Sequence, residues 1–518
     1  MTTNSHHERV PVLIAGGGSV GLTASLLLAR HGVRSLVAER HLGTSILPRA
    51  FGTNVRTMEI FRVLGLEEAI QAVEVDVGGR PLLLAMQTLD GPVLELVPFQ
   101  NSGDPDDPAW PSPTRVSFCA QDVLDPVLVR ALSQAELAEL RFGTEISGLR
   151  PDPAGVTAEL TDRRDGTRHV VKADYLIAAN GANSSIREAL GIGMTGHDIS
   201  TEINVLFEAD LSRALGAKRA ILYRLRNQWL PHGGLFRNID GGVRWTMFTR
   251  DTGDTRPGRM ADIIRACAGD PDLDVEILAS GAWRKAAMVA DQFRAGRVFL
   301  AGDAAHRLTP AGGLGLNTGI QGAHNLAWKL AAVLHCWAGP DLLDTYDAEW
   351  RPAASHAVEL SQRIETTGHR AASKMLGQML GTAYQQGAFA RDGTCPPDVA
   401  DPVADYVPTA RPGHRAPHYL LSSGGCRRST IDLFDLKFIA LSPNKRWCDA
   451  ARATGAALGI PLSAHVIADS AWAAQYGVGP DGAVLVRPDG YVAWRRAEAC
   501  DDMHGEFHRA VDTVLCRN

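Results

Sequence analysis

The chain lacks the cysteine patterns of a zinc protein or a dithiol redox protein. Its eight cysteines form no C-x-x-C pair and no zinc-ligand spacing, so we assign no metal site. Scattered thiols are typical of the reducing cytosol, and we therefore expect a cytoplasmic protein. The cysteines occupy positions 119, 267, 336, 395, 426, 448, 500 and 516.

The chain also lacks an excess of positive charge and an uninterrupted hydrophobic run. Its 52 Lys and Arg residues are outnumbered by 58 Asp and Glu residues, which gives a net charge of −6. Phosphate backbones are bound by basic faces, so we expect no nucleic-acid partner. Residues 10–29 carry no charged side chain, but Pro11 and several glycines interrupt them. We therefore expect a buried strand, turn and helix there, with no membrane span and no signal peptide.

What is present is the composition of a globular protein of more than one domain, with 518 residues, 45% of them hydrophobic. Residues 200–290 are expected to be β-rich, because Leu222, Tyr223, Trp245 and Phe248 lie in alternating patterns. Residues 317–335 place apolar side chains on one face of a long helix. Residues 391–417 are rich in Pro and Asp and predict a linker, with a separate domain of about a hundred residues after it.

A dinucleotide-binding turn is indicated near the start of the chain. Residues 10–15 predict a strand, residues 22–31 a helix and residues 35–39 a second strand, and the sequence GGGSVG joins the first two. Such a βαβ unit predicts an α/β fold with a parallel, doubly wound, Rossmann-like sheet.

The glycines of this turn suit a pyrophosphate. Gly16 permits the tight turn, Gly18 permits close approach of the ligand, and Gly21 permits close packing of helix and strand. The helix N-terminus supplies N–H groups and partial positive charge. Glu39, at the end of the second strand, can accept hydrogen bonds from ribose hydroxyls. A glycine turn that binds nothing is the alternative, and the motif alone does not distinguish FAD from NAD.

A second motif, RVFLAGDAAHRLTPAGGLGLNTGIQGAHNLAWKLAAVL, occupies residues 297–334. Asp303, at the end of a predicted strand, can accept hydrogen bonds from a sugar-alcohol chain, and Pro310 stiffens the loop that follows. The glycines of the loop let backbone lie against a flat ring. The helix that we expect from Asn317 then directs its N-terminal dipole at negative charge on that ring. The alternative is that Asp303 only caps a turn and the glycines only form a loop.

In these motifs the sequence resembles the flavoprotein aromatic hydroxylases built like para-hydroxybenzoate hydroxylase. It is most similar to the branch that acts on aromatic polyketides, such as the aklavinone and angucycline hydroxylases, and the resemblance covers nearly the whole chain. It implies a monooxygenase in which NAD(P)H reduces FAD, O₂ adds at flavin C4a, and the hydroperoxide transfers oxygen to an aromatic ring. It also implies that the backbone of residues 314–317 lies beside the isoalloxazine. No catalytic side chain is assigned, and His306, Arg307 and His324 are more easily read as packed or capping residues.

Further segments match the family pattern. Arg49 resembles the arginine near the FAD pyrophosphate, where NAD(P)H also approaches, whereas Arg56 is equally well read as a structural ion-pair partner. Gln121 resembles a glutamine that contacts the cofactor, with a surface helix start as its alternative. Asn180, followed by Gly181, stands where the family usually has Asp-Gly. The residues that we expect to contact FAD are Gly16, Gly18, Ser19, Val20, Gly21, Glu39, Arg40, Arg49, Gln121, Gly302, Asp303, Pro310, Gly313, Leu314, Gly315, Leu316 and Asn317.

Two consequences of the Asn180 departure remain open. Loss of the negative charge could leave Arg49 freer for nicotinamide phosphates. Alternatively, Asn180 could simply cap the helix that follows. Gly322 likewise replaces a usual aspartate.

The substrate is expected between the FAD domain and the β-rich layer of residues 185–290, because pockets favour domain interfaces. Each candidate lining residue is also a plausible core residue. The candidates are Tyr223, Trp229, Phe236, Met247 and Trp283. There is no second G-x-G-x-x-G after a strand, so we expect NADPH or NADH to bind without a domain of its own. We expect a monomer or a homodimer.

The C-terminal part resembles the thioredoxin-like appendage of this hydroxylase branch. It has no C-x-x-C pair, so Cys448 has no neighbouring thiol in sequence. Thiol–disulfide chemistry needs an attacking and a resolving thiol, so a structural or interface role is expected. The expected division of the chain is 1–75, 111–185 and 291–400 for FAD, 76–110 and 186–290 for substrate, and 405–518 for the thioredoxin-like domain.

Three other functions stay open on sequence alone. The first is a Baeyer–Villiger enzyme on the same fold, and the second is a hydroxylase of simple phenols. The third is a non-catalytic flavin-binding protein with a vestigial site.

Overall fold

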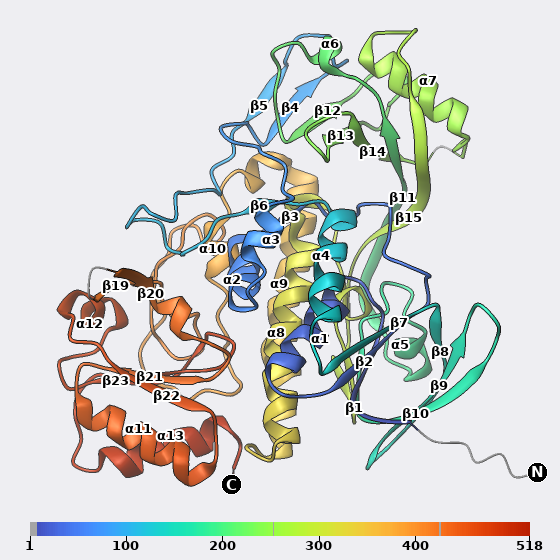
Figure 1. Cartoon of the computed structure of the whole chain (residues 1–518). Helices are drawn as coiled ribbons and strands as arrows, with labels where there is room; N and C mark the ends of the chain where they lie inside the picture. Colours follow the sequence, from blue (N-terminus) through green and yellow to red (C-terminus); the bar gives the residue numbers. More distant parts are fainter. Residues whose placement is uncertain (1–7, 252, 424–425, 518) are drawn as a thin grey trace, which may run out of the picture.

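The computed structural model describes residues 8–251, 253–423 and 426–517 (Figure 1). An eight-stranded sheet contains the order β16-β17-β10-β1-β2-β7, in which every pair from β17 to β7 is parallel. The doubly wound sheet that the βαβ pattern predicted is therefore present. Its strands are β1 (Glu8–Ala15), β2 (Ser35–Glu39), β7 (Ala138–Phe142), β8 (Thr144–Asp152), β9 (Gly155–Asp162), β10 (Arg168–Ala178), β16 (Arg294–Ala295) and β17 (Val298–Leu300).

Long helices surround this sheet, and the core between them is apolar. The helix after the second motif begins at Leu314, one turn earlier than predicted, because Gly313 in the left-handed conformation leads directly into it. The first helix likewise begins at Ser19, directly after Gly18. The helices are α1 (Ser19–Arg30), α2 (Val55–Val63), α3 (Glu67–Gln71), α4 (Gln121–Ser133), α5 (Ser185–Ala189), α8 (Leu314–Leu334), α9 (Asp344–Thr367) and α10 (Leu376–Leu380).

A second eight-stranded sheet lies over the N-terminal end of α8 and the C-terminal end of α9, at the top of Figure 1. Its order is β18-β15-β11-β14-β13-β12-β4-β5, and β12 and β4 are the parallel pair. One face packs on α7 (Pro257–Ala268) and α6 (Ser212–Leu215), and the other faces α8 and α9. These helices belong to the part of the chain around the first sheet that is expected to bind FAD, called the FAD domain below. The strands are β4 (Leu83–Met86), β5 (Glu95–Val97), β11 (Met194–Glu208), β12 (Leu222–Leu225), β13 (Gly234–Asn238), β14 (Arg244–Arg250), β15 (Glu276–Ala290) and β18 (His306–Arg307).

A short two-stranded sheet pairs β3 (Gly52–Thr53) with β6 (Ser117–Phe118). Residues next to these strands, Phe51 and Ala120, pack against the second sheet. None of the helices in the described parts of the chain is long and apolar enough to cross a membrane.

The C-terminal part forms its own four-stranded sheet in the order β22-β21-β23-β24. Cys448 is buried there, and no disulfide joins the seven cysteines whose side chains are described; the side chain of Cys426 lies outside them. The elements are β19 (Leu420–Ser423), β20 (Cys426–Ser429), β21 (Phe438–Ser442), α11 (Lys445–Leu458), β22 (Leu462–Val466), α12 (Ser470–Tyr476), β23 (Ala483–Val486), β24 (Val492–Arg496) and α13 (Met503–Val514).

Buried ion pairs join this C-terminal part to the helices of the first. Arg415 donates from Nε to Glu59 Oε2 of α2 at 2.9 Å. Arg487 donates from Nη1 to Glu349 Oε1 of α9 at 2.8 Å, and Lys329 of α8 donates to the other oxygen of Glu349 at 2.7 Å. All five side chains are at most 1% exposed. The C-terminal part is therefore docked through charges that have no access to water.

Candidate active site

Three segments that are far apart in sequence meet at Val20, in the first turn of α1. A Cβ added to Gly319 of α8 would lie 2.6 Å from Val20 Cγ2 and 3.3 Å from Gly302 Cα. A Cβ added to Gly302 would lie 3.1 Å from the same methyl carbon. Glycine at both positions therefore permits contact between α1, α8 and the end of β17. The two glycine-rich motifs are brought together in this way, with α1 packed on α8.

The glycines of the first motif differ in what surrounds them. Gly16 has φ +105°, and a Cβ there would collide with the carbonyl oxygen of Ala179. A Cβ on Gly21 would collide with the carbonyl oxygen of Gly16. At Gly18, by contrast, a Cβ would meet no atom within 4 Å. Packing within the protein thus requires the first and third glycines, whereas Gly18 borders open space.

Helices α1 and α8 both begin without a side-chain cap. Their N-cap residues are Gly18 and Gly313, and neither helix has an acidic residue in its first turn. A Cβ at Gly313 or at Gly315 would also meet nothing within 4 Å. The first N–H groups of both helices therefore remain without side-chain acceptors beside open space, which is the usual arrangement of an anion site.

Glu39 holds the first turn. Its carboxylate accepts a hydrogen bond from the Gly17 N–H at 2.7 Å and another from the His41 N–H at 2.8 Å. The side chain is 12% exposed, so its oxygens remain close to solvent. A carboxylate in this position can accept ribose hydroxyls in addition to the turn. Arg40, which follows it, is exposed.

Asp303 is an acceptor without a donor. Its side chain is exposed, and no described side chain donates a hydrogen bond to it. The surrounding protein nevertheless raises the pKa of Asp303 by desolvation, against the charges of Arg49 and Arg307. The carboxylate of Asp303 is therefore accessible, although protein surrounds it. This is what the carboxylate expected to hold a ribityl chain would require.

Arg49 is exposed and acts on two carboxylates, since its charge opposes the rise in pKa that burial causes at both Asp303 and Asp125. Asp125 accepts from Ser19 Oγ and, at 3.3 Å, from Gln121 Nε2. Burial raises the pKa of Asp125 to about 6, against those hydrogen bonds. The sequence interpretation missed Asp125, although its position one helical turn after Gln121 places both on one face of α4.

Asn317 fixes the start of α8 through its side chain. Oδ1 accepts from the Asn54 N–H at 2.8 Å, and Nδ2 donates to the carbonyl oxygens of Gly52 at 3.1 Å and of Gly313 at 2.8 Å. This leaves the backbone of the first turn for contact with a ligand. The side-chain amide of Asn317 therefore positions the loop, and both its oxygen and its nitrogen are already hydrogen-bonded to backbone.

The remaining residues of the predicted flavin loop have mixed surroundings. Pro310 is exposed and precedes a single 3₁₀ turn over residues 311–313. Leu314 is buried against the second sheet, and Leu316 packs on the core of the first. Among the described residues no cluster of His, Cys, Asp and Glu could hold a metal ion.

Asn180 is not itself the cap of the helix that follows, contrary to one of its two explanations. The cap of α5 is Ser184, which accepts from the Arg187 N–H, and Asn180 Oδ1 accepts from the Ser184 hydroxyl at 2.6 Å. Asn180 therefore supports the cap and does not form it. Gly322 has a packing reason, because a Cβ there would lie 2.7 Å from Cδ1 of Trp350.

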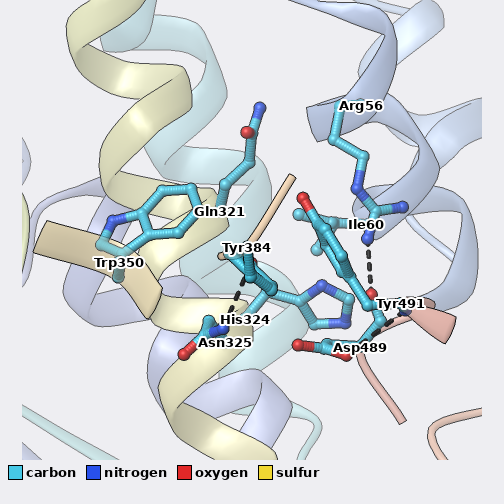
Figure 2. A pocket seen from close by; sticks show the side chains of 9 residues that line it. All are labelled: Arg56, Ile60, Gln321, His324, Asn325, Trp350, Tyr384, Asp489 and Tyr491. Carbon is cyan, nitrogen blue, oxygen red and sulfur yellow. Dashed lines mark hydrogen bonds between the residues drawn. The ribbon is translucent and has the colours of Figure 1, made fainter. Parts of the chain in front are cut away.

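The histidines near the second motif are buried. Burial lowers the pKa of His306 to about 4 and that of His324 to about 3, so both are neutral at pH 7. His324 lines a small pocket between α8 and the C-terminal part, beside the stacked rings of Tyr384 and Tyr491 (Figure 2). Arg56 reaches the same pocket and pairs with Glu59 at 2.9 Å, which is the structural role given as its alternative.

Three of the five predicted substrate contacts are core residues. Tyr223, Phe236 and Met247 are opposite one another in register and are buried beneath α7, on the sheet face away from the FAD domain. Trp229 is exposed on that same side, with the Arg259 guanidinium 5.2 Å from its ring. Strand alternation gave no means of telling the two faces apart. Trp283 remains a candidate, because it is half-buried and shares the other face with Asn204.

The face toward the FAD domain carries half-buried side chains in place of a closed core. Leu222, Leu235 and Phe248 alternate with the buried residues and are partly accessible. Asn204 of β11 donates from Nδ2 to the Pro48 carbonyl oxygen at 3.1 Å, which ties this face to the loop before β3. Accessible apolar side chains between two domains are typical of a site for a small apolar ligand.

Comparison with known proteins agrees with this architecture. The model of an FAD binding domain matches residues 9–361, and that of the aromatic-ring hydroxylase C-terminal domain matches residues 409–517. The tetracenomycin B2 monooxygenase-dioxygenase of Streptomyces olivaceus is 37% identical over 98% of this chain and 99% of its own. The aklavinone 12-hydroxylase RdmE of Streptomyces purpurascens is 36% identical over 98% and 99%.

Solved structures match over the same length. The flavin-dependent monooxygenase PieE, in complex with FAD and substrate, has a TM-score of 0.91 at 34% identity and covers 98% of this chain and 99% of its own. Aklavinone-11 hydroxylase, in a ternary complex with FAD and aklavinone, has a TM-score of 0.88 at 35% identity, with 99% of each chain covered. The resemblance inferred from the two glycine motifs is confirmed: this chain belongs to the FAD-dependent aromatic-ring hydroxylases.

Proposed function

We propose that this enzyme uses NAD(P)H and O₂ to insert one oxygen atom into a polycyclic aromatic substrate of the polyketide type. The observation that carries the proposal is the open space beside each of Gly18, Gly313 and Gly315, at the uncapped N-termini of two helices that pack on each other. Asp303, to which no described side chain donates a hydrogen bond, is exposed near them in sequence. These features fit a dinucleotide that reaches from α1 to α8. The half-buried face of the second sheet lies across from them.

The residues that would hold FAD divide by the group they suit. The N-terminus of α1 and Arg49 suit the pyrophosphate, Glu39 the adenosine ribose and Asp303 the ribityl chain. The first turn of α8 offers N–H groups to the flavin ring. When bound, FAD supplies the activation of O₂. No side chain is assigned to proton transfer, since the two histidines near the motif are buried and neutral.

The substrate class rests on what the relatives act on. Several proteins that match this chain over nearly its whole length are named for their action on tetracenomycins or aklavinone. A second candidate is hydroxylation of a monocyclic phenol, because the 4-methyl-5-nitrocatechol 5-monooxygenase of a Burkholderia species is 35% identical over 98% of the chain. The half-buried aromatic side chains of the second sheet favour the larger substrate.

NAD(P)H is proposed as the reductant without a domain of its own, because the sequence has one strand–turn–helix dinucleotide motif and FAD accounts for it. We also propose that the C-terminal part is thioredoxin-like in fold but structural in role, because its sequence has no C-x-x-C pair and Cys448 is buried.

The test begins with the purified protein, which should be yellow and release FAD on denaturation. NAD(P)H oxidation should be slow alone and faster with a tetracyclic phenol than with a monocyclic one, because reduced flavin without substrate wastes electrons as peroxide. NMR of the product separates ring hydroxylation from Baeyer–Villiger insertion, which adds the same mass. A rate of NAD(P)H oxidation that is unchanged by every aromatic compound tested would contradict the proposal and favour an oxidase or a carrier.

A further inference from the structure

The face of the second sheet toward the FAD domain holds several polar groups without partners. Among the described side chains, Arg237 Nε and Nη2, Thr246 Oγ1, Asn204 Oδ1 and Trp283 Nε1 are buried and make no hydrogen bond. They belong to one face, since Arg237 is opposite Thr246 and Asn204 is opposite Phe248 in the strand register. Buried polar groups in folded proteins are almost always paired, so a cluster of unpaired ones points to a ligand.

Arg237 is the charged member of this cluster. It is 8% exposed, and its guanidinium lies between two aromatic rings, 4.7 Å from the centroid of Phe51 and 5.2 Å from that of Phe248. Desolvation lowers its pKa to about 10, so it is still a cation at neutral pH. The rings fix the plane of the guanidinium and leave its edge, with the N–H groups, for an acceptor.

The same ring connects Arg237 to the flavin loop. Phe51 immediately precedes Gly52, whose carbonyl oxygen accepts from Asn317 Nδ2 in the first turn of α8. Phe51 also contacts Phe118, and Phe118 contacts Phe99, at centroid distances of 5.6 and 5.4 Å. An aromatic wall with one cation therefore adjoins the loop that we assign to the flavin ring.

The carboxylate that influences Arg237 is Asp122 of α4. Its charge opposes the fall in the pKa of Arg237, but no hydrogen bond joins the two, and Asp122 Oδ2 accepts from Arg244 at 3.0 Å. By comparison, the half-buried Arg224 on the same sheet face is paired with Glu95 at 2.6 Å. Of these three arginines, Arg237 is the one without a partner.

We propose that Arg237 is the specificity-determining residue for the substrate, binding an ionised ring oxygen of a polycyclic phenol through its guanidinium edge. This rests on the proposed function and names the group by which that substrate is held. A phenolate oxygen has the negative charge and the lone pairs to accept hydrogen bonds from the unpaired N–H groups of Arg237. The aromatic wall can pack against the rings attached to that oxygen. A carboxylate on the ring has similar chemistry, and a matched ligand pair separates the two.

The experiment uses the holoenzyme and alizarin, a tricyclic phenol that changes from yellow to red when it loses a proton. Wild type should hold bound alizarin red at a pH where free alizarin is yellow. Its 2-methyl ether, which has lost that acidic hydroxyl, should bind about 10- to 100-fold more weakly. Arg237→Gln should leave bound alizarin yellow, raise KM for a polycyclic phenol by a similar factor and erase the preference over the ether. Arg237→Lys should restore part of each effect, and Arg224→Gln should change none.

Each outcome decides the proposal. Yellow bound alizarin in wild type, or equal binding of phenol and ether, overturns it without any variant. A red complex in Arg237→Gln, with normal FAD content and unchanged KM, also overturns it. A preference for anthraquinone-2-carboxylate over alizarin would replace the phenolate by a carboxylate. These results differ from failure of the proposed function, in which wild type shows no aromatic-dependent NAD(P)H oxidation at all.

Discussion

Replacing Arg415 by Met should destabilise the protein strongly, because it leaves Glu59 of α2 buried with part of its compensation removed. Glu59 is fully buried and accepts from Arg415, from Arg56 at 2.9 Å and from the Ser112 hydroxyl at 2.7 Å. Burial alone would raise the pKa of Glu59, but these groups, led by Arg415, hold it near 2. Met has similar length, so the change removes charge and hydrogen bonds more than volume.

The magnitude follows from that pKa. A shift from 4.5 to about 2 corresponds to roughly 3 kcal/mol at about 1.4 kcal/mol per unit. Loss of one partner of a buried pair typically costs about 3–5 kcal/mol, which agrees. Since the folded-state pKa is the lower one, this contribution is complete above pH 4.5 and is lost as the pH falls toward 2. The difference between wild type and variant should therefore be full at pH 7.

Thermal and urea unfolding, followed by circular dichroism, measure the effect. Lys374→Met is the matched control, because Lys374 pairs with Asp405 at 2.6 Å while both side chains are at least 40% exposed. An exposed pair contributes at most about 1 kcal/mol. Arg415→Met should also release FAD more readily, since α2 follows Asn54, which donates to Asn317 at the start of α8. Equal stability of the two variants would refute the argument that buried charge docks the C-terminal part.

Three further predictions concern the flavin site. Glu39→Ala should weaken FAD binding by about 1.5–3 kcal/mol through loss of charge-assisted hydrogen bonds, measured by fluorescence titration of the apoprotein; unchanged affinity would remove the ribose assignment. Gly319→Ala should destabilise the holoprotein by about 1–3 kcal/mol in thermal unfolding, because its Cβ would lie 2.6 Å from Val20 Cγ2, and Val20→Ala in the same chain should recover part of the loss. Asn180→Asp should shift the thermal midpoint little, because aspartate can still accept from Ser184, and an altered NAD(P)H dependence of flavin reduction in stopped flow would show that charge at this position matters.

The parts of the fold that depend on local pattern could be predicted from the sequence. Glycines at fixed spacing between an apolar strand and an apolar helix specify one kind of turn, and both such turns occur where expected. Val20 was included only as part of the first motif. That it touches Gly302 and Gly319 depends on the packing of segments almost three hundred residues apart, which no local pattern encodes.

The substrate side could not be predicted in the same way. An alternating strand shows that it has two faces, but not which face meets α7 and which meets the flavin loop. Large apolar side chains were chosen, and Tyr223, Phe236 and Met247 proved to be core for the same reason that they attracted notice. Arg237 directly follows Phe236, but nothing in the sequence marked it as a site residue, because a charged residue in a strand is ordinarily exposed to solvent.

Because α1 and α8 begin without side-chain caps, the stability of this enzyme should depend on the supply of flavin in the cell. No side chain caps either helix, so a bound cofactor would also satisfy their first N–H groups and thereby stabilise the fold. Ligand at about 100 times its dissociation constant adds roughly 2.7 kcal/mol of stability, and about 1–2 kcal/mol is enough to change cellular abundance several-fold. A cell short of riboflavin should therefore lose the polypeptide itself to proteolysis, and the yield of recombinant protein should rise with riboflavin in the medium.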